Sequence, residues 1–327
     1  MIDVARLAGV SVATVSRVLS TPEIVSADTR ERVEAAIRET GYRMNAVARS
    51  LRSQRSGAVL VLIPDIDNPF FSTLLRGIEE EAQMLDLSVL IGNTAGDTER
   101  EENYLRTVGE RRADGLILLT GRLPGHARPD RILPPTVVAA ERIDATLPTV
   151  RVDNAGAARM AVEHLIALGH RRIAHIAGPP GNVLTAERLE GYRAALAAVD
   201  LPDGPVRHGT FTIPSGFGAA TALLDLDPKV TAVFASNDEM AVGAIQAAKA
   251  RGLDVPLDLS VVGFDDIPYA GAYDPALTTV RQPRFEIGRA AMRSLGRLLA
   301  DGDEGAAVPS DEVLPVELIV RGSTGPA

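Results

Sequence analysis

The sequence predicts an α/β protein in which a small all-α head precedes a body of two doubly wound, parallel-sheet subdomains. Three observations support this prediction. The first 42 residues contain short helical patterns and no strand alternation. From residue 58 onward, short β-branched runs alternate with amphipathic helical patterns, an order typical of parallel sheets. The alternation then repeats in the second half of the chain, which divides the body into two subdomains.

Length and composition exclude several classes of protein. The 327 residues are enough for two or three domains, and 46% of them are hydrophobic, which is enough to build buried cores. No apolar run approaches the ~18 residues of a membrane-spanning helix, and no basic segment followed by an apolar block opens the chain. Cysteine is absent, which excludes disulfides and thiolate chemistry. We therefore expect a cytoplasmic protein with no membrane partner.

Charge is divided unevenly along the chain. Residues 1–56 carry nine Arg and six acidic side chains, a net charge of +3, whereas the rest carries 25 basic and 37 acidic side chains, a net charge of −12. A polyanion such as DNA would be attracted to the basic head and repelled by the acidic body. The charge pattern therefore points to a nucleic-acid partner for the head.

The head contains the pattern of a helix-turn-helix. A first helical segment ends at Ala8, Gly9 allows a tight turn, and Ser11 can cap a second helix over residues 12–19. A third helix follows Ser26 and stops near residue 41. The second helix would be about 12 Å long, which suits insertion of its first turn into a DNA major groove. The competing interpretation is an ordinary helical hairpin with a solvated polar face.

The body alternates strands and helices. Residues 43–56 form a basic linker whose apolar spacing is compatible with a short helix. After it, buried strands are predicted at 58–63, 88–92, 115–119, 136–140, 172–177, 231–235 and 260–264, and helices near 70–85, 98–112, 185–199, 216–224 and 238–251. Ligands of such sheets bind at the carboxyl ends of the strands, so two facing subdomains would form a cleft.

The sequence offers little support for catalysis or for metal binding. It contains no GxxxxGK[ST], GxGxxG or GxSxG motif. None of its five histidines forms an i,i+4 pair that would place two rings on one helix face. We therefore expect no catalytic residues, no metal site and no cofactor.

The motifs IDVARLAGVSVATVSRVL and VSADTRERVEAAIRETGYRMNAVARSLR, followed by the βα body, resemble the LacI/GalR family of bacterial transcriptional repressors. The resemblance extends over nearly the whole chain. It implies a periplasmic-binding-protein-like body and an operator-binding homodimer, in which a ligand in the cleft alters the geometry of the two heads. Three positions depart from the family pattern: few residues precede Asp3, Ser20 replaces the usual Asn, and Met44 replaces the usual Pro.

The resemblance also assigns DNA-binding positions. Val12, Ala13 and Arg17 match positions that read base edges, and the linker matches the family's hinge helix. Leu51 matches a leucine that wedges between central base pairs in the minor groove, although a lone leucine in an amphipathic segment is more often buried. The expected DNA-binding set is Val12, Ala13, Thr14, Ser16, Arg17, Asn45, Leu51 and Arg52, in which Thr14 and Ser16 would bond phosphates.

For the body, the resemblance places effector contacts in the cleft. Arg188, Asn237 and Asp265 match polar positions that hold ligand hydroxyls or ring nitrogens, and Phe211 matches an aromatic that stacks on the ligand. Asp265 could instead cap a helix. Weaker candidates from the first subdomain are Asn68, Phe70, Phe71 and Glu141, of which the two phenylalanines could simply be core residues.

We expect a ligand-responsive repressor whose effector belongs to the sugar class. A transport solute-binding protein would share the body but leave residues 1–56 unexplained and lack a signal peptide. An enzyme acting on a sugar or nucleoside would need catalytic residues that the sequence does not offer. A dimer is favoured over a tetramer because no heptad-patterned tail follows the strand-like segment 313–320. The expected domains are 1–42, 43–56, 57–155 with 284–311, 156–283 with 312–320, and a tail at 321–327.

Overall fold

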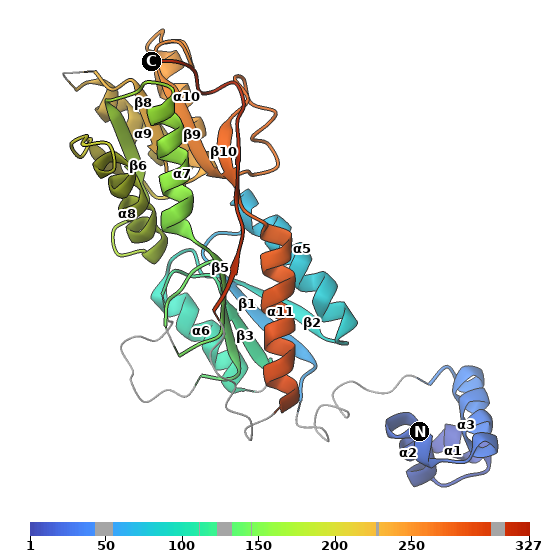
Figure 1. Cartoon of the computed structure of the whole chain (residues 1–327). Coiled ribbons are helices and arrows are strands. Elements are labelled where there is room, and N and C mark those ends of the chain that lie inside the picture. The colour runs from blue at the N-terminus through green and yellow to red at the C-terminus, as the bar shows by residue number, and fades with distance from the viewer. Residues whose placement is uncertain (43–54, 111, 123–132, 145, 227–228, 302–310) are drawn as a thin grey trace. The chain divides into compact units, whose positions relative to one another are not determined.

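The computed structural model describes residues 1–327 except 43–54, 111, 123–132, 145, 227–228 and 302–310. The chain forms two compact units, Met1–Arg55 and Ser56–Ala327 (Figure 1). None of the described helices is both long enough and apolar enough to cross a membrane.

The first unit is the predicted helical head. Its elements are α1 (Ile2–Ala8), α2 (Val12–Ser20), a short 3-10 helix (Pro22–Ile24) and α3 (Ala27–Thr40). Gly9 ends α1 in the left-handed region at φ 66°, which glycine adopts without the steric cost of a Cβ. As expected, the side chain of Ser11 caps α2 by accepting a hydrogen bond from the backbone N–H of Thr14. The small core of the head consists of Val4, Ala5, Ala8, Val15, Val18, Val33 and Ala36.

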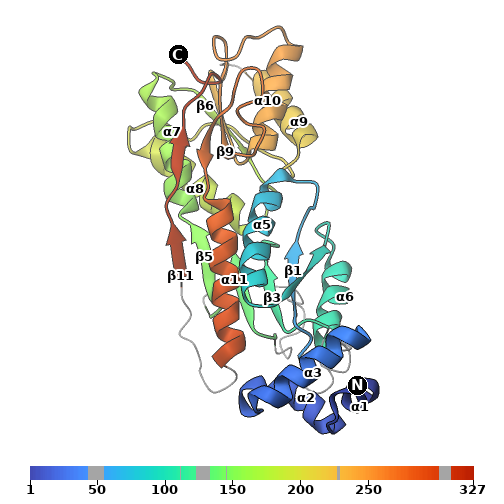
Figure 2. The same ribbon diagram turned by 90° about the vertical axis from the view of Figure 1, so that its right-hand side faces the viewer.

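The first lobe of the body is a fully parallel six-stranded sheet with helices on both faces. α5 (Pro69–Met84) and α11 (Arg284–Asp301) bury one core, and α6 (Thr98–Gly109) covers a second core on strands β1 and β3 (Figure 2). In sheet order the strands are β11 (Asp311–Leu314), β5 (Thr149–Val152), β4 (Thr136–Ala139), β3 (Gly115–Leu118), β1 (Ala58–Ile63) and β2 (Ser88–Asn93).

The second lobe repeats this architecture, with one antiparallel strand at its edge. α7 (Asn154–Ala167) and α8 (Val183–Ala197) bury one face, and α9 (Ile213–Leu224) and α10 (Asp238–Ala250) bury the other. In sheet order the strands are β12 (Glu317–Ile319), which is antiparallel to its neighbour, then β10 (Thr278–Arg281), β9 (Ser260–Asp265), β8 (Ala232–Ala235), β6 (Ile173–Ala177) and β7 (Val206–His208).

Three segments connect the two lobes. The first crossing runs from β5 to α7, the second from β10 to α11, and the third from β11 to β12. The expectation that all of residues 312–320 belong to the second lobe is wrong, because β11 pairs with β5 in the first sheet up to Leu314. The expected tail 321–327 is an integral part of the second lobe, because Ser323 is fully buried and the Ala327 N–H donates to the Leu168 carbonyl at 3.0 Å.

Strand β2 is not the buried strand that its sequence suggests. It lies at the edge of the first sheet, and the side chains of Leu90 and Ile91 are 39% and 45% exposed. A run of apolar residues predicts a strand but cannot tell whether both of its faces are covered. Two helices, α7 and α11, and the strands β5, β7, β10 and β12 were not predicted as separate elements.

The helices α5 and α11 approach each other so closely that only glycine fits at two positions. A Cβ built on Gly77 of α5 would lie 2.1 Å from the carbonyl oxygen of Phe285, and a Cβ built on Gly288 of α11 would lie 2.1 Å from the carbonyl oxygen of Leu74. Both obstacles are backbone atoms, which cannot move without shifting a helix. The contact therefore fixes α11, which follows the second crossing, against the first lobe.

Substituting Gly77 by alanine should lower the free energy of unfolding of the body by about 1–3 kcal/mol, because the added methyl forces the two helices apart. The matched control is G218A on α9, where an added Cβ meets no atom within 4 Å. This control should be neutral or raise stability by about 0.5–1 kcal/mol, since alanine favours the helix over glycine. Urea unfolding of both variants measures the difference, and equal effects would contradict the close packing.

Candidate functional site

A cavity of about 820 Å³ lies between the two lobes. Its walls come from segments that follow the carboxyl ends of parallel strands in both sheets, such as Asp65 after β1, Glu141 after β4 and Pro179 after β6. This is the position at which doubly wound sheets bind ligands, because the loops there carry side chains and exposed backbone N–H groups. The volume lies in the range of small-molecule sites.

The cavity brings together all eight side chains that the sequence analysis singled out for the effector. They come from both lobes, although they are spread over about 200 residues of sequence. The lining members are Asn68, Phe70, Phe71, Glu141, Arg188, Phe211, Asn237 and Asp265. Further polar members, which were not predicted, all lie in loops or helix caps near strand ends: Asp65, Thr120, Arg122, Asn182, Thr210 and Thr212.

Arg188 is the central cation of the cavity. It is 3% exposed on α8, and its guanidinium carbon lies 3.8 Å from the centroid of the Phe264 ring, a cation–π contact. Its Nη1 donates to the carbonyl of Ser236 and lies 3.9 Å from Oδ1 of Asp265. Burial lowers the pKa of Arg188, and the charge of Asp265 opposes this shift. The guanidinium is thus held at the edge of the cavity with its charge matched by one carboxylate.

Asp265 is the matching anion, and it is held under strain. It ends β9 with φ at 112°, in a region that L-residues seldom adopt, so the surrounding structure must hold it there. Burial raises the pKa of Asp265 to about 6, and the charges of Arg188 and Arg284 and a 2.8 Å hydrogen bond from Gln282 act in the opposite direction. The carboxylate is therefore ionised at neutral pH and available as an acceptor. Backbone strain of this kind concentrates at functional sites.

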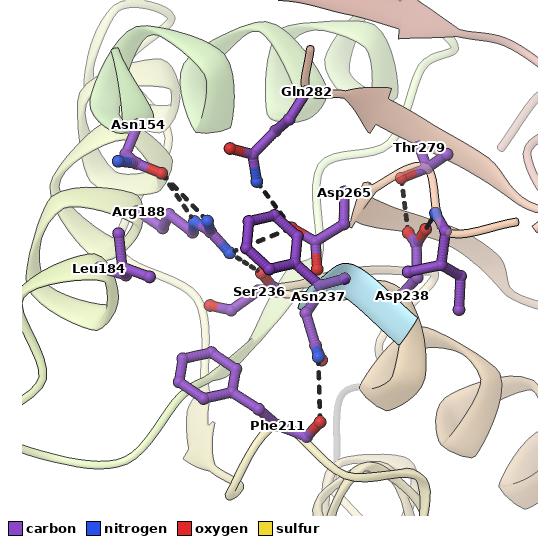
Figure 3. Close-up of polar contacts among 12 residues, drawn as sticks. Asn154, Leu184, Arg188, Phe211, Ser236, Asn237, Asp238, Asp265, Thr279 and Gln282 are labelled. Atoms are coloured by element: carbon purple, nitrogen blue, oxygen red, sulfur yellow. Dashed lines mark hydrogen bonds and ion pairs between the residues drawn. The ribbon is translucent and has the colours of Figure 1, made fainter. Parts of the chain in front are cut away.

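Asn237 shapes the cavity through the backbone of a neighbouring loop. Its Oδ1 accepts from the Met240 N–H and caps α10, and its Nδ2 donates to the carbonyl of Phe211 at 3.0 Å (Figure 3). Phe211 has a positive φ of 63°, and its ring is half-buried on the cavity wall. Asp265 itself ends β9 and is followed by loop and turn residues, so the helix cap considered for it is not observed. Asn237 also fixes the loop that presents the aromatic ring.

The first lobe contributes an apolar wall. The rings of Phe70 and Phe71 meet edge to face, with centroids 5.1 Å apart. Both belong to the core of this lobe and also line the cavity, so their place in the core does not exclude a contact with a ligand. Asn68 caps α5 by accepting from the Phe70 N–H at 2.9 Å, which places the pair at the start of the helix.

Glu141 is a buried carboxyl group on the same wall. It accepts a hydrogen bond from the backbone N–H of Gly121, and the described residues include no cation in salt-bridge contact with it. Burial raises the pKa of Glu141 to about 8, the Gly121 N–H acts against this shift, and the nearby charge of Glu187 adds to it. Glu141 is therefore protonated at neutral pH. A protonated carboxyl group can donate a hydrogen bond, which a carboxylate cannot.

The head presents the first turn of α2 to solvent. Val12 is 43% exposed, and Ala13 and Arg17 are also exposed, whereas Val15 and Val18 are buried against α1 and α3. Thr14 and Ser16 are half-buried, and the Thr14 hydroxyl lies 2.9 Å from that of Ser11. The other expected DNA contacts, Asn45, Leu51 and Arg52, and the expected hinge helix lie outside the described residues.

A helix-turn-helix head joined to a two-lobed body with a ligand-sized cleft defines a ligand-responsive transcriptional regulator. Residues 1–45 match the family described as bacterial regulatory proteins, lacI family. Residues 56–315 match the family described as periplasmic binding proteins and sugar binding domain of LacI family. The chain belongs to the LacI family. This membership sets aside the two competing classes, a transport protein and an enzyme.

Proteins of similar sequence or structure match this chain over most of its length. The HTH-type transcriptional repressor CytR of Escherichia coli K12 is 45% identical over 330 residues, which cover 99% of this chain and 96% of the repressor. Catabolite control protein A of Priestia megaterium is 40% identical, and the alignment covers 91% of each chain. Among solved structures, the Lac repressor dimer bound to operator and the anti-inducer ONPF has a TM-score of 0.85 at 32% identity, with 99% of this chain and 98% of that chain covered.

The protonation of Glu141 predicts how stability depends on pH. The folded protein keeps this proton up to pH about 8, whereas the unfolded chain releases it near the ordinary pKa of 4.5. Between these values the folded state binds more protons, so the contribution of Glu141 to stability falls as the pH rises. E141Q removes this dependence and should unfold at a higher temperature than the wild type at pH 9, with a smaller difference at pH 5. Thermal unfolding from pH 5 to 9 measures the gap, and a gap independent of pH would contradict the assignment.

Proposed function

We propose that this protein is a ligand-responsive repressor that binds a pseudopalindromic operator as a homodimer, and that a small effector of the sugar class in the cleft changes its operator affinity. One observation carries the proposal. The eight side chains expected to hold an effector, from both lobes, line a single cavity of suitable volume. An effector that contacts both lobes can favour one arrangement of the lobes over another, which is the requirement for a ligand to act as a switch.

The composition of the cavity favours a neutral, polyhydroxylated effector. Carboxyl groups, amides and two arginines provide acceptors and donors around the Phe211 ring, an arrangement that suits hydroxyl groups and the apolar face of a sugar. Solved relatives carry such ligands: a CelR regulator is described in complex with cellobiose, and a LacI family regulator from Enterococcus faecium with bound ribose. We infer that Arg188 and Asp265 bind the effector, with Phe211 stacked on it.

In this proposal, α2 reads the operator. An exposed guanidinium such as that of Arg17 can form two hydrogen bonds with guanine O6 and N7, and exposed Val12 and Ala13 can contact thymine methyl groups. Thr14 and Ser16 would bond phosphates, which orient the helix without reading sequence. Residues 43–56 would act as the linker and hinge helix, with Leu51 as a minor-groove wedge.

A homodimer through the bodies is supported by an apolar edge on the first lobe. Leu85, Leu90 and Ile91, at the end of α5 and along the edge strand β2, are each about two-fifths exposed, and Met84 is 65% exposed. Exposed apolar residues that gather on one edge mark a protein contact, whereas scattered ones need no explanation. The Lac repressor relative was solved as a dimer on its operator. Two chains would place two heads on two half-sites.

Operator binding should depend on Arg17. A preferred duplex can be selected from a randomised pool with the full chain, and binding then measured by fluorescence anisotropy. R17A should weaken binding by about 5- to 150-fold, because an arginine–guanine pair contributes about 1–3 kcal/mol. R38A removes the same charge from an exposed site on α3 and should change binding much less.

A salt titration and two further duplexes, one with a single half-site and one scrambled, complete this measurement. Wild-type affinity should fall steeply with salt, because phosphate contacts release counterions. A duplex with one half-site should bind far more weakly than the pseudopalindrome, because only one head can engage. Salt-insensitive binding, or equal affinity for a scrambled duplex, would rule out sequence-specific operator recognition.

Effector binding should appear as thermal stabilisation of the body. A ligand at 100 times its Kd stabilises by about 2.7 kcal/mol, so a screen of sugars and nucleobases with the full chain should reveal one that raises the unfolding temperature. D265N should lose most of this shift relative to its own ligand-free baseline. D203N, whose exposed ion pair with Arg193 lies outside the cavity, should keep it. A full shift in D265N would show that the ligand binds elsewhere.

A further inference from the structure

The guanidinium of Arg188 is held on one side by a residue that does not line the cavity. Its Nε and Nη2 both donate to Oδ1 of Asn154, at 3.1 and 3.0 Å (Figure 3). Asn154 is 1% exposed. Because both arginine groups are donors, the atom that faces them must be the amide oxygen. The amide nitrogen on the other side donates to Oε2 of Glu187 at 2.9 Å, which fixes the same orientation independently.

Asn154 belongs to the first crossing between the lobes. β5, in the sheet of the first lobe, ends at Val152, and Asn154 is the first residue of α7, which packs in the second lobe. The helix does not need Asn154 as a cap, because Asp153 is the N-cap and accepts from the Gly156 N–H at 2.9 Å. Its side chain is therefore free to serve the arginine, which lies 34 residues further along the chain.

The other member of the ion pair is anchored to the second crossing. Gln282 lies between β10 of the second lobe and α11 of the first, and its Nε2 donates to Oδ1 of Asp265 at 2.8 Å. Arg188 and Asp265 are thus each bonded to a different connection between the lobes. A rotation of one lobe against the other must pass through these connections.

We propose that Asn154 is a positioning residue for effector binding: from the first crossing, it orients the guanidinium of Arg188 toward the cleft. The inference rests on the proposed function of the cleft, because it assigns the orientation of a residue expected to bind the effector. Without the amide oxygen, two buried N–H groups of a cation lose their acceptor, and the guanidinium can turn away from the cavity. The state of the crossing and the geometry of the binding group are then coupled.

The test changes Asn154 and Glu187, the acceptor of its amide nitrogen. N154A removes the acceptor. The double variant N154D/E187Q supplies a carboxylate to accept from Arg188 and an amide to donate to that carboxylate, so it keeps the local charge and both hydrogen bonds. E187Q alone is the control, because the new side chain retains an oxygen that can accept from Asn154 and removes only the charge of Glu187, which acts on Arg188 through space.

The first measurement needs no effector. Nuclear magnetic resonance of the full chain with isotope-labelled arginine can follow the Nε–H of Arg188, assigned by its absence in R188K. A hydrogen-bonded, buried Nε–H exchanges slowly with water. We expect slow exchange in the wild type, E187Q and N154D/E187Q, and exchange at least about 10-fold faster in N154A. Slow exchange in N154A would overturn the proposal.

The second measurement uses D-ribose, the sugar bound in one solved relative. If D-ribose stabilises the wild type, N154A should bind it about 10- to 100-fold more weakly, and binding should be restored in N154D/E187Q. Failure of the double variant to restore binding while it still binds operator would also overturn the proposal. If D-ribose does not bind the wild type, that result counts against ribose as effector, and the exchange rates alone decide the role of Asn154.

Discussion

The structure depends on a buried pair of opposite charges placed where two parallel sheets point their carboxyl ends at one cavity. Removing Arg188 and Asp265 from water is costly, and at 3.9 Å their attraction alone does not recover that cost. The protein compensates with many anchors: an aromatic ring under the guanidinium, the Ser236 carbonyl, and amide groups from two crossings. These anchors leave both groups rigid, and a rigid site binds a ligand with less loss of entropy.

The two crossings that hold this pair differ in how well their own polar groups are satisfied. At the first crossing, both ends of the Asn154 amide are hydrogen-bonded. At the second, Oε1 of Gln282 and both Nε and Nη1 of Arg284 are buried without a partner among the described residues. Such groups cost free energy in the arrangement that leaves them unpaired. Within the part of the chain that the structure describes, the polar groups of the first crossing are therefore better satisfied than those of the second.

Segments with a strong periodic pattern were predictable from the sequence. The other elements were not predicted, for physical reasons that the structure makes clear. The apolar strands β1, β6 and β9 were predictable from their buried apolar runs, whereas β7 has only three residues, too few for a pattern. In α7, half of the buried residues are alanines, and the exposed residues include Met160 and Ala167, so the contrast between its two faces is weak. The cavity wall was predicted from family motifs. Asn154 and Gln282 were not, because their roles arise only from contacts with residues 34 and 17 positions away.

The head explains why modest events in the body can control DNA binding. Its core is built from seven small side chains, and Val12 and Ala13 on α2 are exposed where packing gives them no purpose. In the proposed function, one such head makes few base contacts, so useful affinity requires two heads on correctly spaced half-sites. Linking two weak sites raises affinity by about 10²- to 10⁴-fold, and this gain is lost when geometry prevents simultaneous binding. An effector therefore need not disturb α2 at all. In the proposed dimer, it only has to favour an arrangement of the lobes that changes how well the two heads match the operator.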